Sequence, residues 1–433
     1  MKDIENQYKT NLLRECLKEY STRKFLYRKM QDYYVGNTDA LKNFQIITSR
    51  TNQKAGVNYL RKFIKEECSY ILGNKITYIS KSYDEDIIKA ISDNLSHWSE
   101  KHDQNLCANM LKFGKAWELY YLDSQGRICA KIISPLNGYA LTDENEDIQL
   151  FMYFYKKQFF DKNVYMDLYL PEGIIEHYNC GASGSGLTLI GEDRNIFKNV
   201  PVSACKISED AELDTIYNDI KLLQDSYEEV LSSTVSEIGD FRQAYIKITG
   251  CIIDDEELVK MKKLGIIQLP NKDCGIEYLT KDIQDAFVQN TLTTLEEKMY
   301  ELTSHINNNV NPSSNTSSLA LRTRLISLES RCKLSGDSIV DCIKNRLKFL
   351  FEYLYIKQGV THNYLDIKPQ LTPFIPSDDT ATAQIISQIG DKLSTETAIS
   401  RFSFIDNPKE EIAKIKKERE EMDSIDLDKL ESV

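Results

Sequence analysis

Glycine, serine and histidine residues in this chain have types that could do chemistry, but they lack the required spacing. The run Gly181-Ala182-Ser183-Gly184-Ser185-Gly186 resembles loops that bind phosphate through backbone N–H groups. No Lys and Ser/Thr pair follows it and it does not open a helix, so the run is typical of a flexible surface loop. Ser183 also fails the Gly-x-Ser-x-Gly nucleophile pattern, because the second glycine comes too early.

The metal-ligating residue types show no metal-binding pattern either. His97 and His102 are off the i, i+4 register of a helical metal pair, so a structural or exposed role is favoured for the histidines. No two of the 10 cysteines have the spacing of a zinc knuckle. No carboxylate pair stands apart from the general acidity. We therefore expect reduced, buried thiols, no metal, no cofactor, no catalytic residue and no enzyme.

Charge and hydropathy limit the partners. The chain has 433 residues, enough for two to four substructures, with 54 Lys and Arg against 66 Asp and Glu, a net charge of -12. Proteins that hold nucleic acid by neutralising phosphates have the opposite balance, although DNA that slides past a repelling wall is compatible with acidity. No apolar run is long enough to cross a bilayer and the start is charged, so we expect neither a membrane span nor a signal peptide.

Two predicted helices separated by a polar loop must position the functional residues of this chain. Apolar residues from Val288 to Ile306 alternate at four and three residues, which predicts an amphipathic helix that needs a partner. A polar run follows, in which Pro312 and the Asn and Ser side chains end the helix. From Leu319 to Leu354 the spacing predicts a helix of roughly 35 to 40 residues, about three times the usual length, with a possible kink at Gly336.

The remaining segments predict an α+β, predominantly helical fold. A helix is expected at about 9–32, and another through 58–72 with Gly73-Asn74 as a left-handed cap. A short strand is expected at 76–79. A hairpin is expected at 116–133, and further strands at 150–155, 164–170 and 173–179 would complete an antiparallel sheet. Helix returns at 212–235, followed by a small α/β insert and a helical, charged C-terminal part.

Several segments, in this order along the chain, resemble bacteriophage portal proteins of the Gram-positive siphophage type. The resemblance rests on Tyr33-Tyr34-Val35-Gly36 and on residues 58–64, 71–78, 113–118, 200–201 with 213–233, 317–322, 393–397 and 405–412. The chain departs from the family at Ser318, where glycine is usual, and in its Asn-rich loop, which is more hydrophobic in other versions. Each segment is weak alone, but the ordered set is specific.

The resemblance implies a ring, commonly of twelve subunits, around an axial channel for double-stranded DNA at one capsid vertex. The implied function is genome packaging, head–tail joining and DNA ejection in a virion assembled in the host cytoplasm. The implied partners are the terminase large subunit, the major capsid protein and scaffold, and a head–tail adaptor, with no membrane. The implied segments are a wing (1–205), a stem helix region (206–249), a clip (250–284), a stem helix (285–306), a tunnel loop (307–318), a long wing helix (319–357), and a crown with C-terminal tail (358–433).

Two sets of residues are expected to face the DNA. The tunnel loop should project toward the ring axis and offer hydrogen bonds and a thin apolar collar through Asn307, Asn308, Asn309, Val310, Asn311, Ser313, Ser314 and Asn315. Acidic side chains on the polar face of the 212–235 helix and just beyond it should line the channel: Glu228, Glu229, Glu237 and Asp240. A solvated helix face and a surface loop are the alternative readings of these two sets.

Two other classes of protein remain to be considered. A non-portal structural adaptor or scaffold protein of the virion would share the acidic helices but would need no central pore. An enzyme of the packaging machinery fails, because the sequence has neither a Walker-type Gly-Lys-Ser/Thr nor an acidic nuclease cluster.

Overall fold

The computed structural model describes residues 2–45, 52–241, 245–250, 252, 254, 256, 259, 274–279, 285–307, 318–373, 379–390, 393–399, 402 and 411–418. The chain divides into two compact units, Met1–Pro373 and Phe374–Val433. The first unit contains both helices and antiparallel strands, which confirms the predicted α+β, predominantly helical fold.

Helices from distant parts of the sequence share the main core of the first unit. Among them are α1 (Lys2–Val35), α3 (Tyr59–Leu72), α5 (His102–Phe113) and α6 (Ile216–Phe241), with α2 (Asp39–Asn43) beside α6 and α4 (Glu85–Leu95) beside strand β1. Their apolar stripes meet at side chains with no exposed surface, including Met30, Leu60, Phe63, Ile64, Leu106 and Met110. This shared burial fixes α6 on the body of the subunit.

Local capping residues set the ends of α3 and α5. The Asn58 side chain accepts a hydrogen bond from Arg61 N (3.0 Å) and begins α3. The predicted left-handed cap at Gly73 is wrong, since its φ of -67° is right-handed. Gly114 has that geometry instead (φ 82°), and a Cβ there would lie 1.7 Å from Ala211 O, so this close approach requires glycine.

The strands form two larger antiparallel sheets where the sequence predicted one. The first has the order β3-β2-β9 and the second β4-β5-β6-β7-β8. The predicted 116–133 hairpin is confirmed as β2 and β3, and Gly126 N donates to Asp123 O (2.9 Å) in its turn. The bounds are β2 (Lys115–Leu122), β3 (Ile128–Ile133), β4 (Gly138–Thr142), β5 (Ile148–Tyr155), β6 (Tyr165–Tyr169), β7 (Ile174–Asn179), β8 (Thr188–Arg194) and β9 (Val202–Lys206), with the short helix η1 (Pro171–Gly173) before β7.

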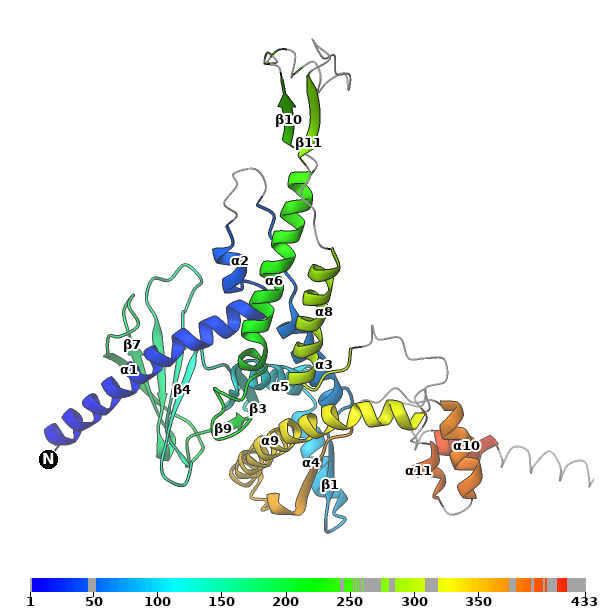
Figure 1. Ribbon diagram of the computed structural model, residues 1–433. Helices are drawn as coiled ribbons and strands as arrows, with labels where there is room; N and C mark the ends of the chain where they lie inside the picture. The colour runs from blue at the N-terminus through cyan, green and yellow to red at the C-terminus, as the bar shows by residue number, and fades with distance from the viewer. Residues whose placement is uncertain are drawn as a thin grey trace, which may run out of the picture. The chain divides into compact units, whose positions relative to one another are not determined.

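Helix α1 covers one face of the five-stranded sheet, as Figure 1 shows. Its apolar residues Leu13, Cys16, Leu17 and Tyr20 pack on buried residues of the sheet, among them Met152, Phe154, Met166 and Leu168. The Tyr20 and Phe154 rings are stacked with their centroids 4.3 Å apart. The alternating inward residues of the strands and the helical stripe of α1 thus form a second core.

The long helix predicted near 319–357 is confirmed as α9 (Ser318–Gln358), 41 residues without interruption. The possible kink at Gly336 is absent. A Cβ at Gly336 would lie 3.2 Å from a Leu371 methyl group, so glycine here allows close packing. After α9 the chain forms η2 (Tyr364–Asp366) and β12 (Ile367–Gln370). Strand β12 pairs with β1 (Thr77–Ser80).

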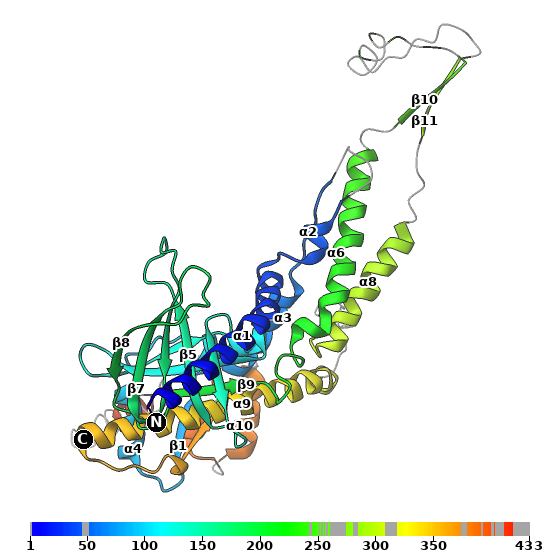
Figure 2. The same cartoon turned by 90° about the vertical axis from the view of Figure 1, so that its left-hand side faces the viewer.

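Helices α6 and α8 (Asp285–Leu302) lie side by side in both views (Figures 1 and 2). Between them in the sequence is the hairpin of β10 (Tyr245–Thr249) and β11 (Gly275–Leu279). The predicted helix to Ile306 ends earlier, at Leu302. Ser304 has a φ of 59°, and the Thr303 hydroxyl donates to Met299 O (2.8 Å), which closes the last turn.

The second unit contains α10 (Asp379–Ile389), α11 (Thr395–Ile399) and a helix over 411–418. These helices agree with the predicted helical C-terminal part.

Candidate functional site

Helix α6 buries a line of polar side chains, although a helix of its pattern was expected to turn polar residues toward solvent. The line follows the i, i+4 spacing that keeps residues on one helical face, and each member has no exposed surface: Gln224, Glu228, Ser232 and Ser236. We refer to these four residues as the α6 ladder. Their partners include backbone groups of segment 53–60, which leads into the first turn of α3.

The ladder binds alternate residues of that segment. Ser236 Oγ accepts from Gln53 N (3.0 Å) and donates to Gln53 O (3.2 Å). Ser232 Oγ accepts from Ala55 N (2.9 Å), and Gln224 donates to Val57 O (3.1 Å). Four helical residues advance about 6.0 Å and two extended residues about 6.6 Å, so the two repeats stay nearly in register from Ser236 to Glu228, which also binds Val57.

Glu228 belongs to this ladder and is therefore not a channel-lining residue, contrary to the sequence prediction. Val57 N donates to Glu228 Oε1 (3.0 Å), and the Thr38 hydroxyl donates to Oε2. The carboxyl group has no exposed surface, and burial raises its pKa above the ordinary value. The physical reason is that the polar face of α6 packs on a backbone segment instead of on water.

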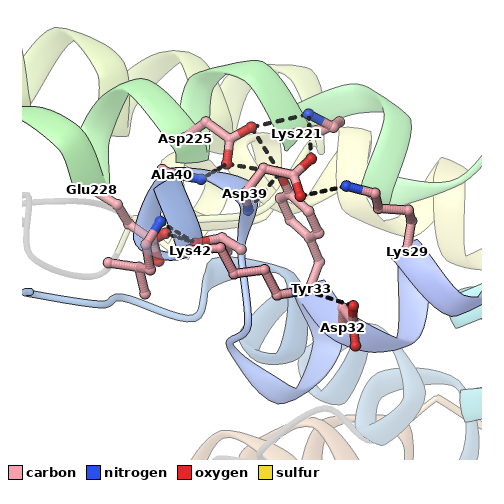
Figure 3. A network of polar contacts seen from close by, with 11 residues as sticks. Lys29, Asp32, Tyr33, Asp39, Ala40, Lys42, Lys221, Asp225 and Glu228 are labelled. Atoms are coloured by element: carbon pink, nitrogen blue, oxygen red, sulfur yellow. Dashed lines mark hydrogen bonds and ion pairs between the residues drawn. The ribbon is translucent and has the colours of Figure 1, made fainter. Parts of the chain in front are cut away.

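A second network holds the same region of α6 to α1 and α2, drawn in Figure 3. The Tyr33 hydroxyl donates to Asp225 (2.7 Å), and Ala40 N donates to the same carboxylate (3.3 Å). Lys221 lies between Asp225 (3.0 Å) and Asp39 (3.6 Å), and Lys29 also pairs with Asp39. Burial acts to raise the pKa of Asp39, but the two lysines lower it below its ordinary value.

The other predicted channel residues have different environments. Glu229 is exposed and Glu237 is half-buried on α6, while the side chain of Asp240 lies outside the described part of the chain. Asn307 is half-buried and its side chain donates to Glu296 (3.4 Å). The other predicted tunnel-loop residues all fall outside the described residues: Asn308, Asn309, Val310, Asn311, Ser313, Ser314 and Asn315.

His305 lies between the end of α8 and the predicted tunnel loop. It is 6% exposed, with Nδ1 2.9 Å from Thr303 O, Nε2 3.0 Å from Phe63 O, and its ring on Phe63. Burial lowers the pKa of His305 to about 4, against the two carbonyl contacts, which raise it. Of the two roles left open for the histidines, His305 has the structural one, because it joins the residues just after α8 to α3.

Helix α9 is held by ion pairs at two places. Near its first half, Ser335 donates to Glu67 (2.6 Å), while Arg331 pairs with Asp219 of α6 (3.2 Å) and with Glu67 (3.4 Å). Glu67 has no exposed surface, and burial raises its pKa. This cluster joins α3, α6 and α9.

The second place is a buried guanidinium. Arg346 is 2% exposed and pairs with Glu118 (2.8 Å) and Asp103 (2.6 Å). His102 Nε2 is 2.5 Å from Glu118, which also accepts from the Tyr120 hydroxyl (2.6 Å). Although burial alone acts to raise it, Arg346 and His102 lower the pKa of Glu118 to about 2.

Nothing in the described part of the chain resembles a metal centre: no group of three His, Cys, Asp or Glu side chains there could hold an ion. The described cysteines are free thiols and most are buried, as expected. The Gly181–Gly186 run is a surface loop between β7 and β8, as predicted. Within the described residues, no helix is long and apolar enough to span a membrane.

The first unit is an α+β body with the side-by-side helices α6 and α8, the β10–β11 hairpin between them in the sequence, and the long helix α9. Residues 13–424 match the family model of the phage portal proteins, SPP1 Gp6-like. The chain belongs to this family. It is a portal protein, a structural component of the virion at the capsid vertex, and the family match decides against the non-portal adaptor or scaffold alternative.

Chains in gene transfer agent particles are similar to this chain. One is in the neck of an empty GTA particle (TM-score 0.48, 9% identity, over 81% of this chain and 88% of that chain). Another is in the virion of a native gene transfer agent particle (TM-score 0.46, 8% identity, over 81% and 88%). A third is in the neck of a native GTA particle computed with C12 symmetry (TM-score 0.46, 9% identity, over 78% and 87%). No curated protein matches the chain.

Proposed function

We propose that twelve copies of this chain form a ring around a channel for double-stranded DNA, used for genome packaging, head–tail joining and DNA ejection. The observation that carries the proposal is the family match over nearly the whole chain. The pair α6 and α8 supports it, because the helices are tethered to the body along one face only and expose another. A ring of such subunits closes through repeated contacts between two different surfaces of each copy.

The segments keep the roles that the resemblance implies. The body to residue 205 is the wing, α6 and α8 are the stem, residues 250–284 are the clip, α9 is the long wing helix, and residues 358–433 form the crown and tail. The segment 307–318 is the tunnel loop. It follows His305, whose contact with α3 fixes where the loop begins.

The channel wall is proposed to be acidic, through Glu229, Glu237 and Asp240. Glu228 has no part in it. Like-charged walls keep DNA centred and mobile, whereas a wall of lysines would bind phosphates with a steep salt dependence. The tunnel loop adds weak contacts that do not depend on DNA sequence, through Asn and Ser side chains and Val310.

The proposed partners are those of genome packaging and particle assembly in the host cytoplasm. The terminase large subunit docks on the clip, the major capsid protein and scaffold surround the ring, and a head–tail adaptor binds the completed vertex. Deleting residues 252–279 is expected to leave ring assembly partly possible and to block packaging. Packaging at the wild-type level by this deletion variant would contradict the clip assignment.

The chain itself is proposed to have no enzymatic activity, and the motor ATPase is the separate terminase. The purified protein is therefore expected to show no ATP turnover. Turnover that a point substitution in this chain abolishes would contradict this part of the proposal.

Electron microscopy of the purified protein tests the central proposal. Rings with a central hole are expected, because the helix pair and the wing of each copy must be covered by neighbours. Monomers or open filaments at all concentrations would contradict it.

A further inference from the structure

The two ends of strand β5 carry surfaces of opposite character. At its C-terminal end, the turn to β6 exposes two adjacent phenylalanines, Phe159 (93% exposed) and Phe160 (71%). Their rings are perpendicular, with centroids 5.2 Å apart, and Asp161 N donates to Gln158 O (3.0 Å) to close the turn. An ordered turn that presents two large aromatic side chains to water is the kind of feature that a partner covers.

The same turn is basic. Lys156, Lys157 and Lys162 are all exposed, and Lys157 lies 4.4 Å from the centroid of the Tyr165 ring. We refer to residues 156–162 as the aromatic tip. A surface that binds the aromatic tip should combine an apolar hollow with negative charge.

A cavity of about 550 Å³ in this chain combines aromatic walls with charged side chains. It lies between α1, all five residues of β4 and the segment 204–213. Its walls include four large aromatic side chains, and Leu213, 67% exposed, also lines it. The four are Tyr20, Tyr27, Trp117 and Tyr139. Such walls suit the face or edge of a phenylalanine ring.

Carboxylates surround the cavity. The turn from β4 to β5, whose flanking residues Thr142 and Ile148 line the cavity, carries Asp143, Glu144, Glu146 and Asp147. The segment after β9, which also lines the cavity, carries Glu209 and Asp210. All six are exposed. We refer to these six carboxylates as the acidic rim.

Cations near the cavity do not balance this charge. Lys206 pairs with Glu146 (3.2 Å), whereas Arg23 (3.0 Å) and Lys115 (2.7 Å) both pair with Glu212 inside the cavity. Contact with Glu146 raises the pKa of Glu209, as expected where carboxylates crowd together. The rim therefore offers negative charge to an incoming group.

The tip cannot reach the acidic turn of its own sheet. The turn from β4 to β5 is at the start of β5 and the tip is at its end, and an eight-residue strand separates them by roughly 25 Å. A contact between these two surfaces therefore requires two copies of the chain. A contact between two different surfaces of identical chains is heterologous and can close a ring.

We propose that the aromatic tip of one subunit inserts into the acid-rimmed cavity of its neighbour and helps to close the ring. This inference rests on the proposed ring. It assigns to the wing a specific interface between copies, with Phe159 and Phe160 as the inserted side chains. The lysines of the tip and the carboxylates of the rim select the correct neighbouring surface.

A cross-link between two separately purified variants tests the contact. One carries Phe159→Cys and the other Leu213→Cys, and they are mixed under conditions that form rings and then oxidised. A disulfide-linked dimer is expected only in the mixture. Because the two introduced cysteines are on different chains, a bond between them cannot form within one chain. The control pairs Phe159→Cys with Val360→Cys, an exposed position beyond α9, and should give no dimer. Equal cross-linking in both mixtures would overturn the proposal.

Charge reversal gives a second, independent test. The triple variant Lys156→Glu/Lys157→Glu/Lys162→Glu is expected to raise the concentration needed for ring formation at least tenfold, measured by sedimentation velocity. The reversal of Glu209 and Asp210 to Lys should do the same. A mixture of the two variants should recover rings at lower concentration than either alone. No recovery would contradict electrostatic pairing of tip and rim.

The variant Phe159→Ala/Phe160→Ala separates this inference from the ring itself. It should assemble at least tenfold less readily than wild type, whereas Leu365→Ala, which removes another exposed side chain, should assemble normally. Normal rings from the double variant would overturn the inference but not the proposed ring. This holds even if the double variant loses capsid incorporation, DNA binding or vesicle binding. A wild-type protein that forms no rings would contradict the proposed function instead.

Discussion

Helices α6 and α9 both bury polar side chains, but against different partners. The α6 ladder binds backbone groups of segment 53–60, whereas α9 uses Arg331 and Arg346 to bind carboxylates of other helices and strands. Backbone N–H and C=O groups occur at every residue, so the ladder fixes where the segment lies but demands little of its sequence. Ion pairs demand particular residues at both ends.

The difference has an energetic consequence for how firmly each contact holds. A typical hydrogen bond contributes about 0.5–1.5 kcal/mol, while breaking a buried ion pair costs about 3–5 kcal/mol. Helix α9 is thus fixed in the body by a few strong contacts. Helix α6, the proposed channel helix, shares one of these ion pairs through Asp219 and adds the hydrogen bonds of the ladder along its length.

Removing the buried guanidinium should have the largest effect. Arg346→Met leaves Glu118 buried without its main counter-charge, so we expect a loss of about 3–5 kcal/mol in the free energy of unfolding. Urea denaturation measures it. Lys344→Met, which breaks an exposed pair with Asp341 on the same helix, is the control and should cost less than about 1 kcal/mol. Similar losses for both variants would remove the distinction between buried and exposed pairs on α9.

The pH dependence of stability should report His305. Its pKa is about 4 in the folded state and about 6.5 when unfolded, so the unfolded chain binds the extra proton first as the pH falls. Stability should therefore decrease from pH 6.5 to pH 4, by about 3 kcal/mol at most from this residue. His305→Gln should flatten this slope in denaturation curves.

His177 should change the free energy of unfolding with pH in the opposite direction. Although burial acts to lower it, Asp167 and Asp193 raise the pKa of His177, so its contribution is present at low pH and is lost as the pH rises through the raised pKa. His177→Gln should therefore remove stability at low pH. If His305→Gln and His177→Gln change the slope in the same direction, the assigned environments are wrong.

Glu228 and Glu229 offer an adjacent pair for testing the ladder. Glu228→Ala leaves Val57 N–H and the Thr38 hydroxyl without their acceptor, and we expect a loss of about 1–3 kcal/mol. Glu229→Ala removes an exposed carboxylate and should change stability by less than about 0.5 kcal/mol. Thermal or urea unfolding compares the two variants. Equal losses would mean that Glu228 is on the solvated face of α6 and not in the ladder.

The smallest effect is expected within the ladder itself. Ser232→Ala removes one hydroxyl that binds Ala55, at a cost of about 1 kcal/mol. Hydrogen exchange should show faster exchange of Ala55 N–H with little change at Leu60, because the contacts are local. Uniform acceleration along segment 53–60 would mean that the ladder opens as one unit.

The sequence predicted elements whose signal lies within one segment. The apolar spacing of residues 319–354 was enough to predict α9, and the turn at 123–126 was enough for the β2–β3 hairpin. The end of α8 was predicted too late because Ile306 continues the apolar spacing. A local hydrogen bond from Thr303 ends the helix before it.

The buried role of Glu228 could not be read from periodicity. A polar helical face predicts contact with water, and its real partner is the backbone of a segment 171 residues away, which leaves no side-chain pattern to detect. One signal was present. Three of the four residues in the line, Gln224, Ser232 and Ser236, are neutral where a solvated face of this acidic chain would carry more charge.

Cross-linking DNA to the tunnel loop tests the central claim most directly. A single cysteine is placed at Asn309 or Asn311, and at Ser183 in the exposed loop between β7 and β8 as the control. A cysteine-directed photo-cross-linker is attached in DNA-filled particles. Strong cross-links from Asn309→Cys and Asn311→Cys and none from Ser183→Cys are the expected result. Intact rings that give no cross-links at either loop position would contradict a tunnel loop on the DNA.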